Sequence, residues 1–274
     1  MNFSQVSHNF HTPLVMGILN ITPDSFSDGG QFDSVETALK QARQMIADGA
    51  KMIDVGGEST RPGAKPVTAE DEINRVVPVI QELRKEFDGV ISIDTNKAEV
   101  MYAAVNAGAD MINDVCALQQ PDALVTAASL KVPVCLMHMQ GEPRTMQDNP
   151  TYTSVVGDVY DFLLQRINAC VAAGIATDRI IVDPGFGFGK TLEHNYQLLK
   201  HLNKFQYLNV PVLAGMSRKS MIGKLLDRDT PDRLAGSLAC AMLACVKGAS
   251  ILRVHDVAET VDLVTIFNQT NSVE

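Results

Sequence analysis

The sequence predicts one α/β domain with the architecture of a (β/α)8 barrel, a TIM barrel, and three features support this prediction. Short apolar, β-branched segments alternate with segments of helical periodicity along the 274 residues, which is typical of a parallel sheet with crossover helices. We count eight such apolar segments. Unusual polar loops follow nearly all of them, as at a barrel mouth, whereas a doubly wound sheet would need one glycine-rich dinucleotide turn after its first strand.

The predicted strands are short apolar runs bounded by polar or turn-forming residues. In chain order they are Leu14–Leu19, Met52–Val55, Val90–Ile93, Met111–Ile112, Val132–Met137, Ile180–Val182, Val210–Leu213 and Ile251–Val254.

Amphipathic segments between these runs are predicted to be helices. Residues 35–46 are one example, with apolar positions spaced three and four apart. Two helix starts have the form of a capping box, with Ser or Thr or Asp followed three residues later by an acid: Thr68 with Asp71, and Asp256 with Glu259. Both pairs predict a helix that begins at the first residue named.

The composition excludes several classes of partner. A net charge of −9 and a pI near 5.1 argue against nucleic acid, because neutralising phosphates requires a clustered excess of Lys and Arg. The five cysteines are odd in number and without a CxxC pair, so we expect buried, reduced thiols rather than disulfides or a zinc site. A small anionic substrate stays compatible with the charge if a few basic residues gather at one place.

We expect a cytoplasmic protein that does not enter a membrane. The polar residues 1–13 form an N-terminal tail without the pattern of a signal peptide, and residues 14–270 form the barrel domain. The most apolar stretch, Ala235–Val246, has about half the length needed to cross a bilayer, and we interpret it as a buried helix. The sequence is compatible with a homodimer but does not predict an oligomeric state.

The residues that follow the predicted strands are strongly polar and would all lie on one rim. In a barrel the carboxyl ends of the strands form the active face, so polar residues there are better catalytic candidates than those on helices. In order they are Asn20 in NITPDSFSDGG, the segment GGESTRPG, Asp94-Thr95, Asn113-Asp114, His138-Met139, Asp183 in DPGFGFGKT, the segment GMSRKS, and Arg253 to Asp256.

The segment DPGFGFGKT suggests a P-loop, because GKT lies between a strand and a helix. The spacing fails at Pro184, where a Walker A motif needs Gly, since proline fixes φ and removes a backbone donor. GxGxxG is also absent from the chain, so nucleotide binding is not favoured.

The long loop MGILNITPDSFSDGG, the turn GGESTRPGA, and the segments DPGFGFGK, GMSRKS and RVHD occur in one order between Val15 and Asp256. In this the chain resembles the dihydropteroate synthases, over nearly its whole length. The resemblance implies a pterin-binding barrel that condenses 6-hydroxymethyl-7,8-dihydropterin pyrophosphate with p-aminobenzoate, giving 7,8-dihydropteroate and pyrophosphate.

By this resemblance the pterin would contact Asp183, Asn113, Asp94 and Lys219. A carboxylate can accept both adjacent N–H groups of the amino-pyrimidinone edge, and an ammonium can donate to the ring carbonyl. Taken alone, an Asp at a strand end is often a helix cap, and an Asn in Asn20's position is often a turn-former.

The resemblance assigns the pyrophosphate to Arg61, Arg253, His255 and Asn20, with the Asn20 amide oxygen as a ligand of Mg2+. Phe26 and Pro62 would form an apolar slot for the p-aminobenzoate ring, and the carboxylate would lie near Ser220 and Lys219. The remaining expected substrate contacts are Thr60, Met137, Phe188 and Gly215, although apolar residues at strand ends are more often core.

We expect an SN1-like reaction, in which Mg2+, arginine and histidine stabilise the departing pyrophosphate and Asp94 offsets the charge of a pterin cation. The catalytic residues would be Asp94, Lys219, Arg253 and His255. Residues 21–30 would form a lid, the alternative being an ordered surface connection. Of the other histidines, we expect His194 and His201 on the surface and interpret His138 as a hydrogen-bonded barrel residue rather than a pocket residue.

Two alternative functions use the same fold. A methyltetrahydrofolate–corrinoid methyltransferase domain has a pterin-binding barrel but no pyrophosphate to expel, and GMSRKS together with the long first loop disfavour it. A non-catalytic pterin-binding barrel would require an incomplete set of anion-binding residues, whereas Arg61, Arg253, His255 and Asn20 are all present.

Overall fold

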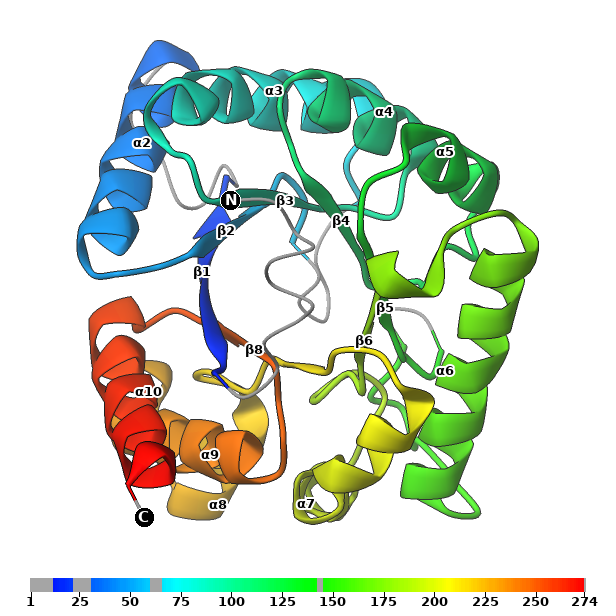
Figure 1. The fold of residues 1–274 in the computed structure, drawn as a ribbon, viewed down its shortest axis with the longest axis vertical. Helices are drawn as coiled ribbons and strands as arrows, with labels where there is room; N and C mark the ends of the chain where they lie inside the picture. The colour runs from blue at the N-terminus through cyan, green and yellow to red at the C-terminus, as the bar shows by residue number, and fades with distance from the viewer. Residues whose placement is uncertain (1–11, 22–30, 60–65, 142–144, 274) are drawn as a thin grey trace.

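A computed structural model describes residues 12–21, 31–59, 66–141 and 145–273. Eight parallel strands form one sheet in the order β6-β5-β4-β3-β2-β1-β8-β7. A parallel bridge between Val182 and Val212 joins the two ends of this order, so the sheet closes into a barrel. Figure 1 shows the ring of strands with the helices around its outside. The predicted (β/α)8 fold is confirmed.

The observed strands agree with the predicted runs except at two prolines. They are β1 (Leu14–Asn20), β2 (Met52–Gly56), β3 (Val90–Asp94), β4 (Met111–Asp114), β5 (Val134–Met137), β6 (Ile180–Asp183), β7 (Leu213–Ala214) and β8 (Ile251–Val254). The fifth strand starts after Pro133, and the seventh is shortened to two residues after Pro211. Proline has no N–H for a ladder, and Pro211 joins the neighbouring strand only as an acceptor, from the Val182 N–H at 2.9 Å.

The described helices cover the outer face of the barrel. They are α2 (Gln31–Ala47), α3 (Ala69–Glu86), α4 (Ala98–Asn106), α5 (Ala123–Leu130), α6 (Val155–Ala172), α7 (Leu192–Lys200), α8 (Ser220–Leu226), α9 (Leu234–Val246) and α10 (Val257–Ser272), with 3-10 turns η2 (Thr177–Arg179), η3 (Leu202–Leu208) and η4 (Thr230–Arg233). Among the described helices, none combines the length and apolar composition that crossing a bilayer requires.

Both predicted helix starts are confirmed, with Thr68 and Asp256 as the N-cap residues of α3 and α10, but only one of the two side-chain caps is present. Thr68 accepts a hydrogen bond from the Asp71 N–H at 3.1 Å, at the start of α3. The prediction of a capping box at Asp256 was wrong, because its side chain makes no cap bond and its carboxylate accepts from the guanidinium of Arg218 instead. A partner 38 positions away in the chain outcompetes the local cap.

The apolar helix predicted for Ala235–Val246 forms as α9, but it is buried on one side only. Cys240 and Ala244 face the core, whereas Leu243 and Val246 are 49% and 63% exposed. The four cysteines at 135, 170, 240 and 245 are buried and free, while Cys116 is only partly buried.

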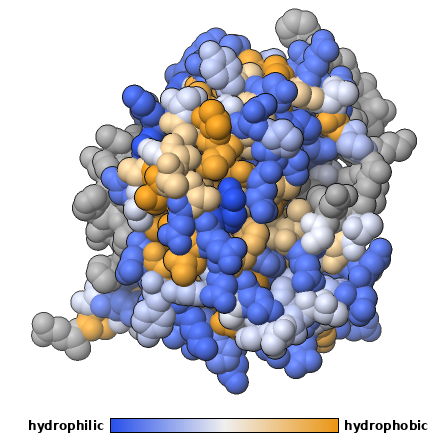
Figure 2. Space-filling view, turned by 90° about the vertical axis from the view of Figure 1, so that its right-hand side faces the viewer, coloured by the Kyte–Doolittle hydropathy of each residue, from blue (hydrophilic) through white to orange (hydrophobic). Residues whose placement is uncertain are grey.

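Figure 2 shows the side of the molecule that carries α5 and α6, where hydrophobic residues lie among hydrophilic ones. The exposed large apolar residues of these two helices are Val125, Leu164 and Val171.

The barrel interior is closed below the mouth by one buried apolar residue from each strand. These are Met16, Met52, Val90, Met111, Cys135, Ile181, Leu213 and Ile251, which form one cluster. Side chains alternate along a strand, so the residues two positions further on also point inward, one layer nearer the carboxyl ends. That layer, here called the interior ring, consists of Ile18, Asp54, Ser92, Asn113, Met137, Asp183, Gly215 and Arg253. An apolar floor therefore carries a mostly polar ring.

Candidate active site at the barrel mouth

Arg253 on β8 bridges two carboxylates, one on β2 and one on β3. Its Nε donates to Asp54 Oδ2 at 2.6 Å, and its Nη2 donates to Asp94 Oδ2 at 2.7 Å. Asp54 Oδ2 also accepts from the amide nitrogen of Asn113 at 3.0 Å. A carboxylate can only accept, so this bond fixes the Asn113 amide with its nitrogen toward Asp54. The arrangement holds a guanidinium and an amide in defined orientations at the centre of the ring.

The charges of this cluster alter the pKa of its members. Burial raises the pKa of Asp94 to about 7, with Arg253 opposing the shift and Asp54 adding to it. The pKa of Arg253 is raised, because the attraction of Asp54 and Asp94 outweighs the effect of burial. Asp94 is therefore poised to change charge near neutral pH, while Arg253 stays a cation.

Lys219 faces the interior ring from the segment between β7 and α8. Its Nζ donates to the backbone oxygen of Phe186 at 2.5 Å and lies 4.6 Å from the centre of the Phe188 ring. Burial lowers the pKa of Lys219 to about 8, with Asp183 opposing the shift. Burial also raises the pKa of Asp183, against the attraction of Lys219.

Gly215 leaves room between two basic side chains. A methyl group at Gly215 would lie 3.8 Å from Arg253 Cβ and 3.9 Å from Lys219 Nζ. The absence of a side chain keeps the space beside both cations open.

The DPGFGFGK segment is a tight loop that binds its own lysine. Gly185, Gly187 and Gly189 all have positive φ, of +72°, +82° and +61°, and a Cβ at Gly185 would lie 1.9 Å from the His138 oxygen. Lys190 is buried and donates to Gly185 O and Phe188 O at 2.8 and 2.9 Å. A P-loop lysine instead reaches outward to phosphates. The geometry agrees with the rejection of a P-loop at Pro184.

His138 lies behind this loop, at the end of β5. Its Nδ1 is 2.9 Å from Lys190 Nζ, and its ring meets the Phe162 ring edge-on at 4.9 Å between centres. Burial and Lys190 lower the pKa of His138 to about 3. This contact pattern agrees with the interpretation of His138 as a hydrogen-bonded barrel residue. His194 is partly buried, and its Nδ1 accepts from the Thr191 N–H at the start of α7.

Asn20 ends β1 beside the acidic part of the ring. The strand register aligns Asn20 with Gly56, and Gly56 with Asp94. A methyl group at Gly56 would lie 3.6 Å from Asn20 Oδ1 and 3.8 Å from Asp94 Oδ2, so both oxygens face the same small space. Within the described part of the chain, no three His, Cys, Asp or Glu residues gather as metal ligands.

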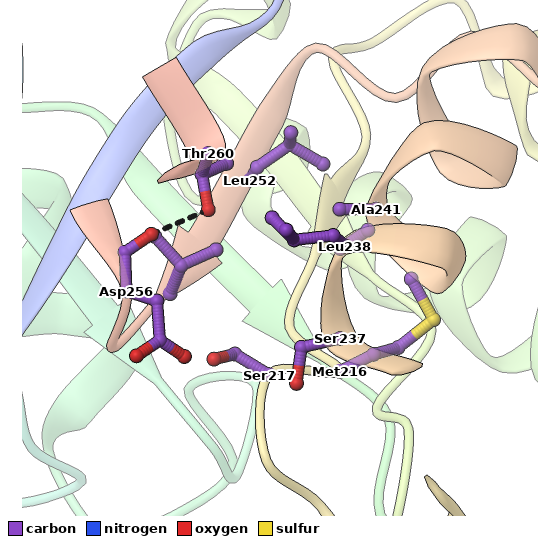
Figure 3. Close-up of a pocket in the computed structure, with 10 residues that line it drawn as sticks. Met216, Ser217, Ser237, Leu238, Ala241, Leu252, Asp256 and Thr260 are labelled. Carbon is purple, nitrogen blue, oxygen red and sulfur yellow. Dashed lines mark hydrogen bonds between the residues drawn. The ribbon is translucent and has the colours of Figure 1, made fainter. Parts of the chain in front are cut away.

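His255 lies on the rim after β8, next to a serine from the preceding loop. Its backbone N–H and its Nδ1 are both 3.1 Å from Ser217 Oγ. Behind Ser217, between β7, β8, α9 and α10, Figure 3 shows a small cavity beside Ser237, Asp256 and Thr260. Its volume of about 10 Å3 suits a single water molecule and excludes a substrate.

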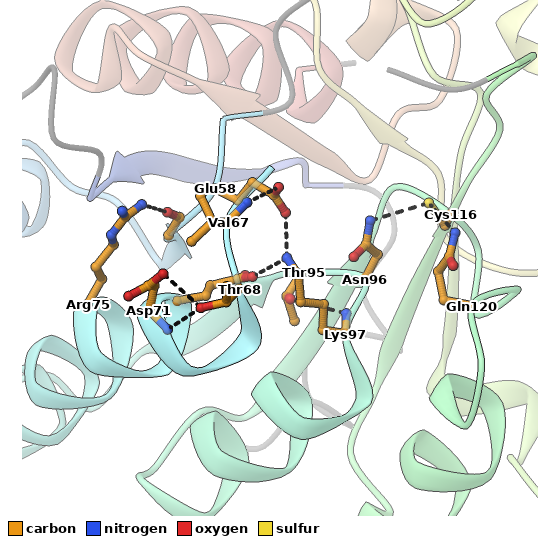
Figure 4. A network of polar contacts seen from close by, with 12 residues as sticks. Glu58, Val67, Thr68, Asp71, Arg75, Thr95, Asn96, Lys97, Cys116 and Gln120 are labelled. Carbon is orange, nitrogen blue, oxygen red and sulfur yellow. Dashed lines mark hydrogen bonds and ion pairs between the residues drawn. The ribbon is translucent and has the colours of Figure 1, made fainter. Parts of the chain in front are cut away.

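A second charged network, which the sequence did not predict, lies outside the ring and is drawn in Figure 4. Lys97 donates to Glu58 Oε2 at 2.5 Å and to Glu72 Oε2 at 2.6 Å. Glu58 also accepts from the Val67 N–H at 3.0 Å, so one carboxylate links the two ends of the loop between β2 and α3. The network fixes the base of that loop.

Most predicted site residues that the structure describes are brought together at the mouth. Asn113, Asp183, Gly215, Met137 and Arg253 belong to the interior ring, with Asp94, Asn20 and His255 at the next level and Lys219 and Phe188 beside it. Ser220 is exposed at the start of α8. Phe26, Thr60, Arg61, Pro62 and the expected lid beyond Ile21 lie outside the described residues.

Sequence reasoning missed Asp54 and Lys190. Asp54 lies inside a predicted strand rather than after one, and its only signal is the alternation from Met52, which places it on the inner face. One of its oxygens, Oδ1, is buried without a hydrogen-bond partner among the described residues.

The similarity of this chain to known proteins agrees with this site. A family model described as "Pterin binding enzyme" matches residues 16–255. The chain is 56% identical to the dihydropteroate synthase of Haemophilus influenzae over 258 residues, which cover 94% of each sequence. The chain belongs to the dihydropteroate synthase family.

Solved structures of the family have the same fold. A Yersinia pestis dihydropteroate synthase in complex with a sulfonamide drug is 52% identical, with a TM-score of 0.92 and 96% of each chain covered. A Xanthomonas albilineans synthase with 4-aminobenzoic acid is also 52% identical, with a TM-score of 0.92 and coverage of 97% and 95%. The chain is thus a transferase with dihydropteroate synthase activity in folate biosynthesis, which confirms the function predicted from the sequence over its two alternatives.

Proposed function

We propose that the interior ring binds the dihydropterin part of the substrate and that the rim above β8 binds its pyrophosphate. The observation that carries this proposal is the closed ring above an apolar floor, in which Arg253 is held by Asp54 and Asp94. A flat, polar heterocycle matches a buried ring of fixed donors and acceptors.

In this proposal the N–H donors of the pterin face acceptors of the protein, and its carbonyl faces a donor. Asp183 accepts the two adjacent N–H groups of the amino-pyrimidinone edge, and the Asn113 oxygen accepts a further ring N–H, because its nitrogen is bound to Asp54. Lys219 donates to the ring carbonyl. Met137, at the inner end of β5, and Phe188 supply apolar contact to the ring faces.

The bond that breaks joins the pterin methylene carbon to the pyrophosphate oxygen, and the electron pair leaves with that oxygen. Arg253, His255 and Arg61 lower the energy of the departing anion, since preorganised cations act most strongly where charge develops. The resulting pterin cation is offset by the Asp94 carboxylate. The amine nitrogen of p-aminobenzoate then attacks the methylene carbon and loses a proton.

We also propose Mg2+ as a cofactor, with Asn20 as its protein ligand. An amide oxygen suits this hard cation, but one neutral ligand cannot hold it alone, and pyrophosphate oxygens and waters would be the remaining ligands. The position of Asn20 Oδ1 beside the small space at Gly56 and Asp94 supports this assignment. When bound, Mg2+ would supply further neutralisation of the pyrophosphate charge.

For p-aminobenzoate we propose a position between Phe188, Ser220 and Lys219, with Phe26, Pro62 and Thr60 contributing from segments outside the described residues. One relative, the Xanthomonas synthase, holds 4-aminobenzoic acid and another, the Yersinia synthase, holds a sulfonamide, which supports binding of both kinds of compound by this chain.

The chain's location and assembly belong to the same proposal. We propose a cytoplasmic enzyme in which residues 1–13 are a tail outside the barrel domain of residues 14–270. We propose a homodimer as well, because Leu225 and Leu226 on α8 and Leu243 and Val246 on α9 expose apolar side chains on neighbouring helices.

The direct test of the function is pyrophosphate release by the purified protein supplied with dihydropterin pyrophosphate and Mg2+. We expect p-aminobenzoate to raise the release rate and to yield one dihydropteroate for each pyrophosphate. A sulfonamide should compete with p-aminobenzoate. Release that is independent of p-aminobenzoate, or no release in its presence, would contradict the proposal.

A further inference from the structure

Lys190 is a buried lysine that the reaction described above does not use. The residue is 3% exposed, and lysine is almost never buried to this degree without partners. Its Nζ lies 2.8 Å from Gly185 O, 2.9 Å from Phe188 O and 2.9 Å from His138 Nδ1, with His138 O at 3.3 Å. An ammonium has three N–H donors, so these contacts occupy all of them. Lys190 thus has no donor left for a substrate.

The three main contacts connect two parts of the barrel rim. Gly185 and Phe188 belong to the loop between β6 and α7, and His138 follows β5. A second bond, from the His138 N–H to Asp183 O at 3.0 Å, joins the same two strands directly below. Lys190 therefore fastens the loop onto the end of the neighbouring strand.

The loop needs such a fastening because its backbone is unusually free. Three glycines with positive φ lie within residues 185–189, and glycine loses more conformational freedom on ordering than other residues. Lys190 adds bonds from within the loop to those that other side chains make with it, which come from Asp183, Asn195, Gln147 and Tyr152. Without it, Phe188 O would lose the Lys190 donor, and Gly185 O would keep the bond from the Phe188 N–H at 3.1 Å.

The contacts of Lys190 Nζ with Gly185 O, Phe188 O and His138 Nδ1 are here called the clamp. His138 contributes an acceptor to it. The low pKa of His138, caused by burial and by Lys190, keeps its ring neutral at physiological pH, so Nδ1 is able to accept. Burial and Lys219 lower the pKa of Lys190, and Asp183 raises it. The two loop carbonyls need two N–H donors, which both the ammonium and the neutral amine of Lys190 have.

The clamped loop in turn positions Lys219. Phe186 O accepts from Lys219 Nζ, and the Phe188 ring lies under the same nitrogen. Gly187 is also close, since a Cβ there would lie 3.3 Å from Lys219 Cδ. These three contacts with Lys219 come from residues 186–188, and Lys190 holds the carbonyls of Gly185 and Phe188 at the two ends of that segment.

We propose that Lys190, together with His138, is a positioning residue for the pterin pocket, because it fixes the loop that places Lys219 and Phe188. This inference rests on the proposed role of Lys219 in binding the pterin. In this proposal the lysine of the GKT sequence binds the protein's own loop and does not contact phosphate. It affects ligand binding through that loop.

The test is calorimetric titration of a dihydropterin into Lys190→Met, which keeps the chain length but removes the donors. Leu83→Ala is the matched control, since Leu83 is fully buried in α3 and lies outside the site. Both variants should unfold at lower temperature. Only Lys190→Met should weaken pterin binding, by about tenfold or more, when both are measured well below their unfolding temperatures. Wild-type affinity in Lys190→Met, or an equal loss in Leu83→Ala, would overturn the proposal.

His138 provides a second route if Lys190→Met does not fold. His138→Leu removes one acceptor and should weaken pterin binding by a few fold, whereas His138→Gln, which keeps an acceptor, should weaken it less. Equal affinities in these two variants and the wild type would contradict the clamp. Asp183→Ala in the same titration separates the clamp from the proposed pterin pocket. If Asp183→Ala loses pterin binding and the Lys190 and His138 variants do not, only the clamp is rejected. If Asp183→Ala binds the pterin as the wild type does, the pterin pocket is rejected.

Discussion

Two clusters near the barrel mouth have the same composition, one cation between two carboxylates, but they occupy different places. Arg253 lies between Asp54 and Asp94 inside the barrel, and Lys97 lies between Glu58 and Glu72 outside it. The two cations are similarly exposed, with 18% of the Arg253 side chain and 22% of the Lys97 side chain accessible. The charges of the members and the exposure of the cation do not distinguish the two clusters. The clusters differ in their position, because the first lies on the inward faces of the strands and the second lies outside the barrel.

The inner cluster faces the space where a substrate would lie, and the outer one joins the loop after β2 to α3 and to the segment after β3. A guanidinium suits the inner position, because its planar set of donors can hold two carboxylates and still present a further edge. An ammonium is sufficient for the outer cluster, where Lys97 binds the Glu58 carboxylate that closes the base of a loop. The comparison predicts that the inner cation governs chemistry and the outer one governs stability.

The largest effect should come from Arg253→Met. Removing the guanidinium takes away stabilisation of the departing pyrophosphate and leaves Asp54 and Asp94 buried without their partner. We expect kcat/KM to fall by roughly 10³-fold, as for other losses of a preorganised charge in an active site. A pyrophosphate-release assay measures this. A value within a few fold of wild type would remove Arg253 from the proposed site.

The pH dependence of kcat/KM should depend on groups in and beside the inner cluster. We expect kcat/KM to rise with pH through about 7, as Asp94 loses its proton, and to fall above about 8, as Lys219 loses its proton. The optimum would then lie between these values. Asp94→Asn should remove the acidic limb while lowering the maximum. A profile that is flat from pH 6 to 9 would contradict the ionisations assigned to the two groups.

The smallest effect on activity should come from Lys97→Met. Glu72 is fully buried, and burial raises its pKa while Lys97 lowers it, so loss of the ammonium leaves a buried acid without its partner. We expect the free energy of unfolding to fall by about 2 to 4 kcal/mol. Urea denaturation gives this value, and kcat/KM should change far less than in Arg253→Met. Equal losses of activity in the two variants would show that the outer cluster also serves the reaction.

The sequence predicts the barrel and most of the site because both depend on local patterns. Apolar runs identify the eight strands, and the polar residues after them, such as Asn113 and Asp183, lie at the mouth in any barrel. Asp54 is different, because it lies within a strand and is exceptional only as a carboxylate on the inner face. Its role follows from register with β3, which the sequence alone does not give.

Long-range partners explain the other differences. Asp256 has the local pattern of a helix cap, yet Arg218 takes its carboxylate, and no pattern within a few residues of Asp256 reveals that competitor. Lys190 belongs to a recognisable GKT sequence, but its acceptors include His138, 52 positions earlier in the chain. The short β7 could have been anticipated from Pro211, which lies within the predicted run. The roles of Phe26, Thr60, Arg61 and Pro62 stay predictions from the family resemblance.

The most direct test of the central claim, that the inward residues of the ring bind the pterin, compares two neighbours on β6. Asp183 points inward, and Val182, also buried, belongs to the core on the outer side of the strand. Calorimetric titration with a dihydropterin should show a loss of affinity of about a hundredfold or more in Asp183→Ala, because two pterin N–H donors lose their acceptor. Val182→Ala should be less stable but should bind the pterin as the wild type does. Unchanged affinity in Asp183→Ala, or an equal loss in both variants, would contradict the account.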